Sequence, residues 1–491
     1  MAVLRFFRPN AGIYAIIHFM QHTRRAFLRQ SALLAGAGLF GPRLLAAMKY
    51  DKNAVLDLFR LRAADTDARV RAGIEENRKS PLLVTFRGPD GKICENVHVQ
   101  VRQTAHSFKY GADIFMLDEI GDDPAKNEAY KDLFAGAFNL ATCPFYWSDL
   151  EPEQGKPRFA KDSPKIYRRP PPDLCVEWCE AHGIEPKAHC LNYPAFEPTW
   201  AKGSIDREKH LLEKRFRELA ERYAARIPMW EVTNETLWSA AWRKSNFYQE
   251  EDYVEWSFKT AEKYFGANKL VINEAHCRIW DDTWFIRSRS PYYMQIERAI
   301  LKGARVDSIG LQFHMFNPAK NVVSATRRFY DPQRLFDVMD TYAALGRPIQ
   351  ITEITIPAYS NDHGDEEVQA EILRELYRIW FSHRAMEAII YWNLSDGYAA
   401  FSEPGDFSKG ENAYYGGLCR FDLTPKPAYH VVKDLFGKEW RTNFTKDVPG
   451  RFAFRGFNGS YEIVATSNGR TARQTFDLGP SYASTLEVKF A

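Results

Sequence analysis

The sequence predicts an α/β protein built on a parallel (β/α)8 TIM barrel, with a small N-terminal β element before the barrel and a C-terminal antiparallel β domain after it. Short apolar stretches typical of buried strands alternate with longer, polar-faced helical segments over residues 108–437. Strands that alternate with helices in this way pair in parallel, and eight of them close into a barrel. Residues 438–491 instead place apolar side chains at every second position, which is typical of antiparallel strands.

Length and composition are those of an ordinary globular protein. The 491 residues suffice for one large domain and one or two small ones, and 45% hydrophobic residues supply a full core. The formal net charge of +3 arises from 66 basic and 63 acidic residues spread along the chain, so we expect no nucleic-acid partner. Most of the aromatic residues, 14% of the chain, belong in the core, but some suit a cleft that stacks sugar rings. We expect a monomer.

An export signal is predicted in residues 1–47. Residues 23–29, Thr-Arg-Arg-Ala-Phe-Leu-Arg, precede an apolar run at 32–40 in an arrangement similar to a twin-arginine signal. That run is too short to span a bilayer comfortably, so we expect a periplasmic or extracellular protein with no stable membrane insertion after export. The cleavage site stays open, and residues 1–22 can be an upstream extension. A chance arginine pair before a hydrophobic helix is the alternative.

Residues 48–107 are predicted to form a helix followed by a β-hairpin. Residues 51–80 are charged, with apolar side chains at helical spacing. Residues 82–86 and 97–102 then alternate apolar and polar side chains on either side of a Gly-Pro-Asp-Gly turn at 88–91. Alternation around such a turn indicates a hairpin.

Eight strands are predicted in the barrel, residues 108–437. They are 108–114, 137–142, 186–191, 229–234, 269–273, 307–313, 349–354 and 388–392. The intervening helices include 207–225, 252–264, 291–302, 332–344 and 366–383, and a last helix at 427–435 closes the barrel. An open, doubly wound sheet is the alternative, but no Gly-rich phosphate-binding loop follows a predicted strand.

The last segment, residues 438–491, is predicted to be a small antiparallel β domain. Its strands are 452–457, 461–466, 471–476 and 485–490, with Asn-Gly pairs at 458–459 and 468–469. Asn-Gly between alternating runs is a strong hairpin signal because both residues tolerate the positive φ of a type I′ turn. The domain could bind carbohydrate, although a plain structural appendage is the simpler interpretation.

The seven cysteines indicate neither a zinc site nor a disulfide framework. None stands in a CxxC pair, and no two histidines have ligand spacing. Cys175 and Cys179 are one helical turn apart, which is a poor geometry for a disulfide. We therefore expect buried free thiols, no metal and no organic cofactor.

Two glutamates close buried-strand patterns and are the candidate catalytic residues. Glu235 ends the stretch Met229-Trp-Glu-Val-Thr-Asn-Glu235, and Glu353 ends Pro348-Ile-Gln-Ile-Thr-Glu353. In a (β/α)8 barrel the carboxyl ends of the strands carry the active site. Two carboxylates on different strands suit the acid/base and the nucleophile of a retaining glycosidase. An ion pair at the barrel rim is the structural alternative for each.

Further motifs surround the two glutamates in a fixed order. They are Trp230-Glu-Val-Thr-Asn234-Glu235, Ile351-Thr-Glu353-Ile-Thr-Ile356, Gly310-Leu-Gln312-Phe-His314, His189 on the third strand, Trp392 and Asp396 after the eighth, Leu150-Glu-Pro-Glu-Gln-Gly155 and Pro425-Lys-Pro-Ala-Tyr429. Together they resemble glycoside hydrolase family 10, the retaining β-1,4-xylanases. The resemblance covers residues 108–437, and it depends on the order and spacing of the motifs taken together.

The resemblance implies a role for each matched residue. Glu235 would be the general acid/base and Glu353 the nucleophile, with carboxyl groups about 5–5.5 Å apart. Asn234 would bond the sugar 2-hydroxyl, His314 would orient the nucleophile, and Trp392 would stack on a sugar ring. The full set expected to bind substrate or support Glu353 is Asn234, His189, Gln312, His314, Trp392 and Asp396. Packing at a strand end is the structural alternative for the histidines, the glutamine and the tryptophan.

Several positions depart from the family pattern on the glycone side. The Asn-bearing acidic loop and the Lys expected after the second strand are replaced by the shorter stretch 138–147. Tyr193 stands where a Trp is expected after the third strand. Tyr398 and Phe401 lie near the place of a second Trp after the eighth strand. The catalytic residues thus match the family while the subsites for the non-reducing sugars differ.

The resemblance implies an endo-acting retaining hydrolase of β-1,4-xylan or a related plant hemicellulose, with a polysaccharide or oligosaccharide as its partner. Another β-glycan, such as a mixed-linkage glucan or a galactan, is an alternative that the altered 143–147 loop leaves open. A non-catalytic carbohydrate-binding barrel is the alternative of a different class, and the presence of both glutamates with Asn234 and His314 argues against it. A metal-dependent hydrolase is disfavoured because the same residues match glycosidase roles.

Overall fold

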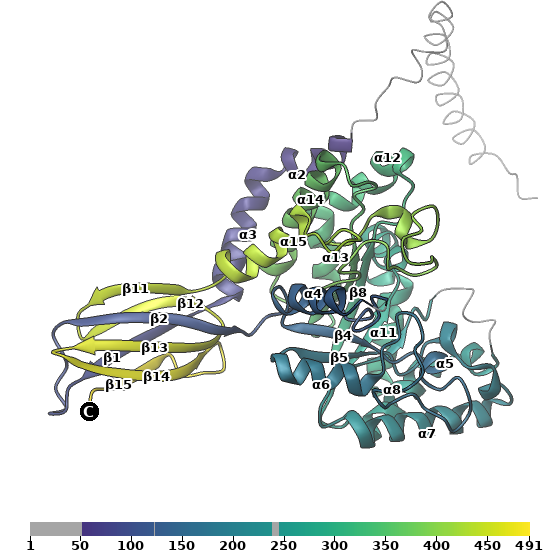
Figure 1. Cartoon of the computed structure of the whole chain (residues 1–491), viewed down its shortest axis with the longest axis horizontal. Helices are drawn as coiled ribbons and strands as arrows, with labels where there is room; N and C mark the ends of the chain where they lie inside the picture. The colour runs from purple at the N-terminus through teal and green to yellow at the C-terminus, as the bar shows by residue number, and fades with distance from the viewer. Residues whose placement is uncertain (1–51, 122, 238–244) are drawn as a thin grey trace, which may run out of the picture. The chain divides into compact units, whose positions relative to one another are not determined.

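The computed structural model describes residues 52–121, 123–237 and 245–491 (Figure 1). The chain divides into two units, Met1–Asp51 and Lys52–Ala491. The predicted export signal in residues 1–47 therefore lies outside the described residues. Within the described part of the chain, no helix combines the length and the apolar character needed to cross a membrane.

Eight parallel strands form a closed barrel, which confirms the predicted fold class. Around the barrel they follow the order β10-β3-β4-β5-β6-β7-β8-β9. Their bounds are β3 Lys109–Asp113, β4 Leu140–Pro144, β5 Glu185–His189, β6 Met229–Asn234, β7 Lys269–Glu274, β8 Ser308–His314, β9 Ile349–Thr355 and β10 Met386–Tyr391. Each predicted strand overlaps an observed one.

Helices connect the barrel strands and cover the outside of the barrel (Figure 1). The longer ones are α4 Pro124–Ala135, α6 Pro172–His182, α7 Ile205–Tyr223, α8 Tyr253–Tyr264, α11 Pro291–Leu301, α13 Pro332–Ala343, α14 His363–Ser382 and α15 Pro427–Asp434; the short ones are α5 Trp147–Leu150, α9 His276–Trp280, α10 Asp282–Ile286 and α12 Val322–Thr326. In α7, Leu212, Phe216 and Leu219 form a buried stripe. The Ser204 hydroxyl caps this helix by accepting from the backbone N–H of Arg207 at 3.3 Å.

Buried polar side chains line the inside of the barrel, where branched apolar residues are usual. Near the amino ends of the strands, the Gln350 amide donates to the Glu387 carboxylate at 2.8 Å. Two residues further along β9, the Thr352 hydroxyl donates to Asn273 Oδ1 at 2.6 Å. Asn273 Nδ2 in turn donates to Glu353 Oε1 at 2.8 Å. Hydrogen-bonded polar side chains thus lie inside the barrel near its amino end, and a second set near its carboxyl end contacts the candidate catalytic Glu353.

The predicted N-terminal β element and C-terminal β domain form one two-sheet sandwich (Figure 1). One sheet has the order β12-β1-β15 and the other β11-β2-β13-β14. The strands are β1 Lys79–Arg87, β2 Val97–His106, β11 Asn443–Val448, β12 Arg451–Phe457, β13 Gly459–Ser467, β14 Arg470–Leu478 and β15 Thr485–Lys489, and the helices α2 Asp57–Leu61 and α3 Ala63–Asn77 precede β1. β11 escaped prediction because only its last residue is buried, so its sequence lacks an alternating pattern.

The predicted hairpin between residues 82–86 and 97–102 is not formed. The turn itself exists, since the N–H of Gly91 donates to the carbonyl of Gly88 at 2.9 Å. The two segments that it joins nevertheless lie in different sheets, β1 in one and β2 in the other. The apolar side chains of both strands meet in the core between the sheets. Alternation alone cannot distinguish strands that pair side by side from strands that face each other across a sandwich.

The two Asn-Gly pairs behave differently. Asn468 and Gly469, with φ of +49° and +74°, form the turn of the β13–β14 hairpin as predicted. Gly459 instead marks the point where the chain passes from one sheet to the other. A Cβ on Gly459 would lie 2.0 Å from the carbonyl oxygen of Ala105, so only glycine fits there.

Among the described residues of the sandwich, Tyr482 is the one large aromatic side chain that is exposed. A structural appendage and a carbohydrate-binding domain both stay predictions for the sandwich.

All seven cysteines belong to the described residues and are free thiols. Five of them are buried, as predicted. Cys94 is half-buried, and Cys277 is exposed.

Candidate active site

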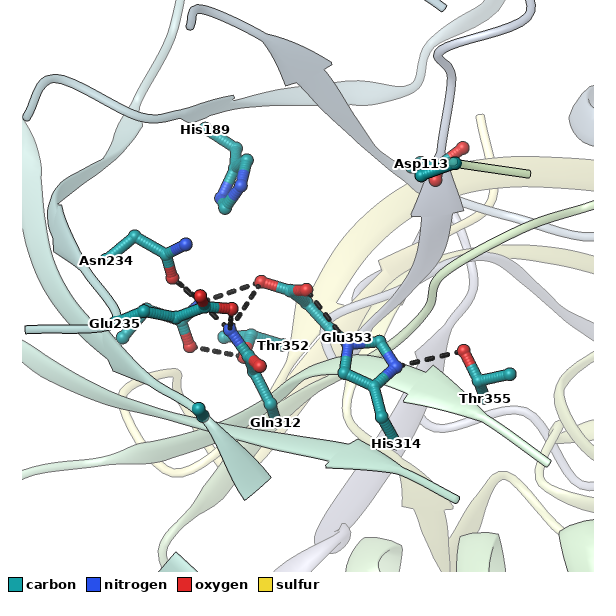
Figure 2. Close-up of polar contacts among 12 residues, drawn as sticks. Asp113, His189, Asn234, Glu235, Gln312, His314, Thr352, Glu353 and Thr355 are labelled. Atoms are coloured by element: carbon teal, nitrogen blue, oxygen red, sulfur yellow. Dashed lines mark hydrogen bonds and ion pairs between the residues drawn. The ribbon is translucent and has the colours of Figure 1, made fainter. Parts of the chain in front are cut away.

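The two candidate catalytic glutamates lie together at the carboxyl end of the barrel. Glu235 directly follows β6, and Glu353 lies near the end of β9. Glu235 has φ of +49°, in the left-handed region that non-glycine residues adopt only when the surrounding structure supports it. Figure 2 shows both carboxylates facing the same space, with Gln312 between them.

Gln312 fixes how far apart the carboxylates can be. Its Nε2 lies 3.1 Å from Glu235 Oε1 and 3.1 Å from Glu353 Oε1. Those two oxygens can therefore be separated by no more than twice 3.1 Å. Inverting glycosidases hold their carboxyl groups at least about 6.5 Å apart to admit a water, whereas retaining enzymes hold them about 5–5.5 Å apart. The upper limit of twice 3.1 Å between these two oxygens is compatible with the retaining separation.

Glu353 is surrounded by hydrogen-bond donors and is almost fully buried. It accepts from Asn273 Nδ2 at 2.8 Å and from Gln312 Nε2, and His314 Nε2 lies 3.1 Å from its Oε2. Burial raises the pKa of Glu353 to about 8, with the Glu235 charge adding to that effect. The Gln312 amide thus contacts both carboxylates, and burial favours the protonated form of Glu353 in the absence of a ligand.

His314 is neutral and oriented. Burial lowers its pKa to about 4, so its ring carries a single N–H at neutral pH. When Glu353 is ionised it can only accept, so in that state Nε2 carries the hydrogen and donates to Glu353. The other ring nitrogen, Nδ1, then accepts from the Thr355 hydroxyl at 2.9 Å. Thr355 thus favours the tautomer in which His314 donates to Glu353.

Asn234 offers a donor to a bound ligand. Its Oδ1 accepts from Asn273 Nδ2 at 2.8 Å, which fixes the orientation of the amide. Its Nδ2 has no hydrogen-bond partner among the described residues, and Figure 2 shows it pointing away from Glu235. The amide is therefore free to donate to a ligand, and its contact with a sugar hydroxyl stays a prediction.

His189 belongs to a buried ionic network beneath the carboxylate pair. Its Nδ1 contacts one oxygen of the Glu231 carboxylate, and the Lys187 ammonium contacts the other oxygen. Burial opposes charge on Glu231, but Lys187 and His189 overcome it and lower the pKa of Glu231 to about 2. Burial also opposes protonation of His189, and the Glu231 charge overcomes it and raises the pKa of His189. The network holds the His189 ring in one orientation.

We expect Lys187→Met to lower the free energy of unfolding by about 3–5 kcal/mol, because it leaves a buried carboxylate without its ammonium partner. Urea unfolding at pH 7 measures the loss. The control is Lys214→Met, which removes a lysine whose 2.6 Å ion pair with Glu218 is exposed and should cost about 0–1 kcal/mol. The pKa of Glu231 is lower in the folded state than its usual 4.5, so the stabilisation is present above that pH and disappears as the pH falls towards 2. Equal losses in the two variants would contradict the buried network.

The described residues contain one group that could reach a common metal ion, His189, Glu231 and Glu353. The Lys187 ammonium already contacts Glu231. A cation at that position would be repelled by this buried charge, so the arrangement does not suit a metal.

Aromatic side chains form the wall of the site beside Trp392. The Trp392 ring lies 5.3 Å from Phe115 and 5.8 Å from both His189 and His314, measured between ring centroids. Tyr146 packs against Phe115 and His189, with ring centroids 5.9 and 5.1 Å apart. Only 7% of Trp392 is exposed. Trp392 thus lies beside the two histidines of the site, and its stacking on a sugar ring stays a prediction.

A polar pair extends this wall to the first strand of the barrel. Asp113 ends β3, and its carboxylate is buried 3.4 Å from the Arg168 guanidinium. Burial raises the pKa of Asp113 to about 7, although Arg168 opposes that shift. Arg168 also donates to Asn393 Oδ1 at 2.6 Å. Neither Asp113 nor Arg168 was predicted from the sequence, because the contact joins segments far apart in the chain.

Asp396 does not reach the site as predicted. Its side chain is fully buried, 2.5 Å from the Lys426 ammonium, and it accepts from the backbone N–H of Gly417 at 2.7 Å. With no exposed surface it cannot contact a substrate. The motif that contains Asp396 therefore stabilises the loop after β10.

Sequence reasoning missed three of the residues that organise the site: Lys187, Glu231 and Asp113. The sequence did contain a signal for Lys187 and Glu231. Both stand within apolar strand patterns, where a charged side chain needs an opposite charge. A lysine on β5 and a glutamate on the neighbouring β6 satisfy that requirement for each other.

Comparison with known proteins places the barrel in one family. The family model described as glycosyl hydrolase family 10 matches residues 113–435, more than half of the chain. Endo-1,4-beta-xylanase 1 of Arabidopsis thaliana is 25% identical over 414 residues, which is 81% of this chain and 38% of that protein. Endo-1,4-beta-xylanase B of Thermotoga neapolitana is 25% identical over 321 residues, 63% of this chain and 83% of that protein.

Two further similarities broaden the comparison. Anti-sigma-I factor RsgI6 of Acetivibrio thermocellus is 25% identical over 415 residues, 81% of this chain and 46% of that protein. Native xylanase 10B from Thermotoga maritima superimposes with a TM-score of 0.52 and 22% identity, covering 68% of this chain and 96% of that chain. The structural match supports the fold.

Proposed function

The chain belongs to glycosyl hydrolase family 10, and we propose from this that it is an endo-acting retaining hydrolase of β-1,4-xylan or a related plant hemicellulose. The observation that carries the proposal is the Gln312 amide, 3.1 Å from a carboxylate oxygen of both Glu235 and Glu353. The resulting upper limit of twice 3.1 Å between the two oxygens supports a double displacement.

In the proposed reaction, Glu235 gives its proton to the glycosidic oxygen while the bond from that oxygen to the anomeric carbon breaks. A Glu353 oxygen bonds the anomeric carbon in the same step. In the second step Glu235 takes a proton from water, the water oxygen bonds the anomeric carbon, and the bond to Glu353 breaks. Asn234 would hold the sugar 2-hydroxyl through both steps, and His314 would keep Glu353 oriented.

Xylan is supported as the substrate by the names of the relatives, among them the enzymes of Arabidopsis thaliana and Thermotoga neapolitana. The chain spans only 38% of the length of the former, and the identities are near 25%. The stretch 138–147 and Tyr193 depart from the family pattern on the glycone side. Another β-glycan is therefore the alternative within the same chemistry.

A sugar-binding barrel without catalysis is the second candidate. The similarity to an anti-sigma factor supports it, because that protein is not named as an enzyme. The complete pair of carboxylates with its supporting histidine argues for catalysis.

We also propose that the protein is exported. The proposal is supported by the twin-arginine-like residues 23–29 and the apolar run that follows them.

The test is hydrolysis of xylan, mixed-linkage glucan and galactan by the purified protein, with the anomeric configuration of the first products followed by NMR. We expect xylo-oligosaccharides that appear first in the β configuration. Products that appear first as α anomers would contradict the retaining pair. β products from a different glycan would keep the chemistry and change the substrate. Sugar binding without hydrolysis would favour the non-catalytic barrel.

A further inference from the structure

The acid/base carboxylate has a hydrogen-bond donor that neither the motif nor the comparisons assign. Tyr193 Oη lies 2.5 Å from Glu235 Oε2. The other oxygen of the same carboxylate, Oε1, faces the Gln312 amide at 3.1 Å. Each oxygen of Glu235 therefore has one protein donor, and the shorter contact comes from the tyrosine that replaces an expected tryptophan.

The backbone that carries Tyr193 is tied to the strand that carries Glu235. The preceding residue, Asn192, exchanges two backbone hydrogen bonds with β6, of 3.0 and 3.3 Å. Its side chain is also held on both sides, because Nδ2 donates to Ser257 at 3.0 Å and Oδ1 accepts from Tyr248 at 2.5 Å. Tyr193 and Glu235 thus stand on two segments whose relative position is fixed.

Packing holds the Tyr193 ring as well. Its centroid lies 5.3 Å from that of Phe196 and 6.2 Å from that of Tyr146, in the aromatic wall of the site. Burial, followed by the nearby Glu235 charge, raises the pKa of the Tyr193 hydroxyl well above its usual value. The hydroxyl therefore stays protonated at neutral pH and can donate to Glu235.

We propose that Tyr193 is a positioning residue for the acid/base, whose hydroxyl fixes the rotation of the Glu235 carboxylate and stabilises its ionised form. The proposal rests on the assignment of Glu235 as acid/base. In the first step of the reaction Glu235 loses its proton to the glycosidic oxygen, and in the second it regains one from water. A donor on Oε2 stabilises the charge that Glu235 carries between the two steps.

The variant Tyr193→Phe removes this donor and keeps the ring. The matched control is Tyr223→Phe, because the Tyr223 hydroxyl also donates to a carboxylate, Asp173, at 2.8 Å, but on helices outside the barrel. Circular dichroism and thermal melting establish that both full-length variants are folded. Both lose one tyrosine–carboxylate hydrogen bond, so differences between them report position in the site.

The first readout needs no substrate. In protein labelled with ¹³C at the glutamate side-chain carboxyl, the Glu235 resonance is assigned by its absence in Glu235→Gln, and its titration midpoint is followed by NMR. We expect Tyr193→Phe to move that midpoint upward by about 1 pH unit, because the ionised form loses a hydrogen bond. Tyr223→Phe should leave it unchanged. An unchanged midpoint in Tyr193→Phe, or an equal shift in both variants, overturns the proposal.

The second readout is the pH profile of kcat/KM on a glycan. We expect the alkaline limb of Tyr193→Phe to move upward with the NMR midpoint, and kcat/KM at the optimum to fall about 10-fold as the carboxylate loses its fixed rotation. A loss of activity with an unmoved alkaline limb would assign Tyr193 a merely structural role. If the wild type cleaves no glycan but Tyr193→Phe still shifts the NMR midpoint of Glu235, the proposed hydrolase function is wrong, whereas the contact between Tyr193 and Glu235 is supported.

Discussion

Replacing Glu353 with alanine should lower kcat/KM by roughly 10⁴- to 10⁶-fold, the scale on which a covalent nucleophile contributes. The alanine leaves a cavity beside the anomeric carbon, which azide can enter. Azide would attack from the face that Glu353 occupied and invert the centre once. The expected product is an α-glycosyl azide from an activated aryl β-glycoside, identified by NMR.

The azide product also distinguishes the two glutamates. A β-glycosyl azide from Glu353→Ala would mean that the covalent intermediate still forms, and Glu353 would then be the acid/base. The matched control is Glu387→Ala, which removes a glutamate from the opposite end of the barrel, where it pairs with Lys269. That variant should retain its turnover and give no azide product.

The loss of activity caused by Glu235→Gln should depend on the leaving group of the substrate. On a glycan, whose leaving group needs a proton, we expect kcat/KM to fall by about 10²- to 10⁴-fold. On an aryl glycoside with an acidic phenol the fall should stay below about 10-fold, since such a phenol leaves without protonation. Equal losses on both substrates would remove Glu235 from the acid role.

The pH dependence of the same variant tests the raised pKa of Glu353. Burial raises that pKa to about 8. Glu235→Gln acting on the activated aryl glycoside needs ionised Glu353, so its kcat/KM should rise with pH and level off above about pH 8. A kcat/KM that already stands at its plateau at about pH 6 would contradict the raised pKa.

The barrel could be predicted because each of its strands is buried on both faces. β6, for example, contains a continuous run of buried residues, so a local pattern sufficed to locate it. The motif order then placed Glu235, Glu353, Gln312 and His314 at the carboxyl ends, where the structure brings them together.

The features that could not be predicted depend on contacts between segments that are far apart in the sequence. The sequence around Asp396 does not show that Lys426 lies against its carboxylate. Its motif therefore led to the wrong prediction that Asp396 contacts the substrate. The same holds for Tyr193, whose hydroxyl finds Glu235 only after β5 and β6 are side by side. The strand pairing of the sandwich was predicted wrongly for a similar reason, because an alternating pattern does not specify which other strand pairs with it.

Both N-terminal strands of the sandwich are central strands. β1 lies between β12 and β15, and β2 lies between β11 and β13. All four partners follow the barrel in the sequence, so β2 has both neighbours only once β13 is made, and β1 only once β15 is made. A chain that ends before residue 443 could complete the barrel but would leave β1 and β2 as unpaired, association-prone strands.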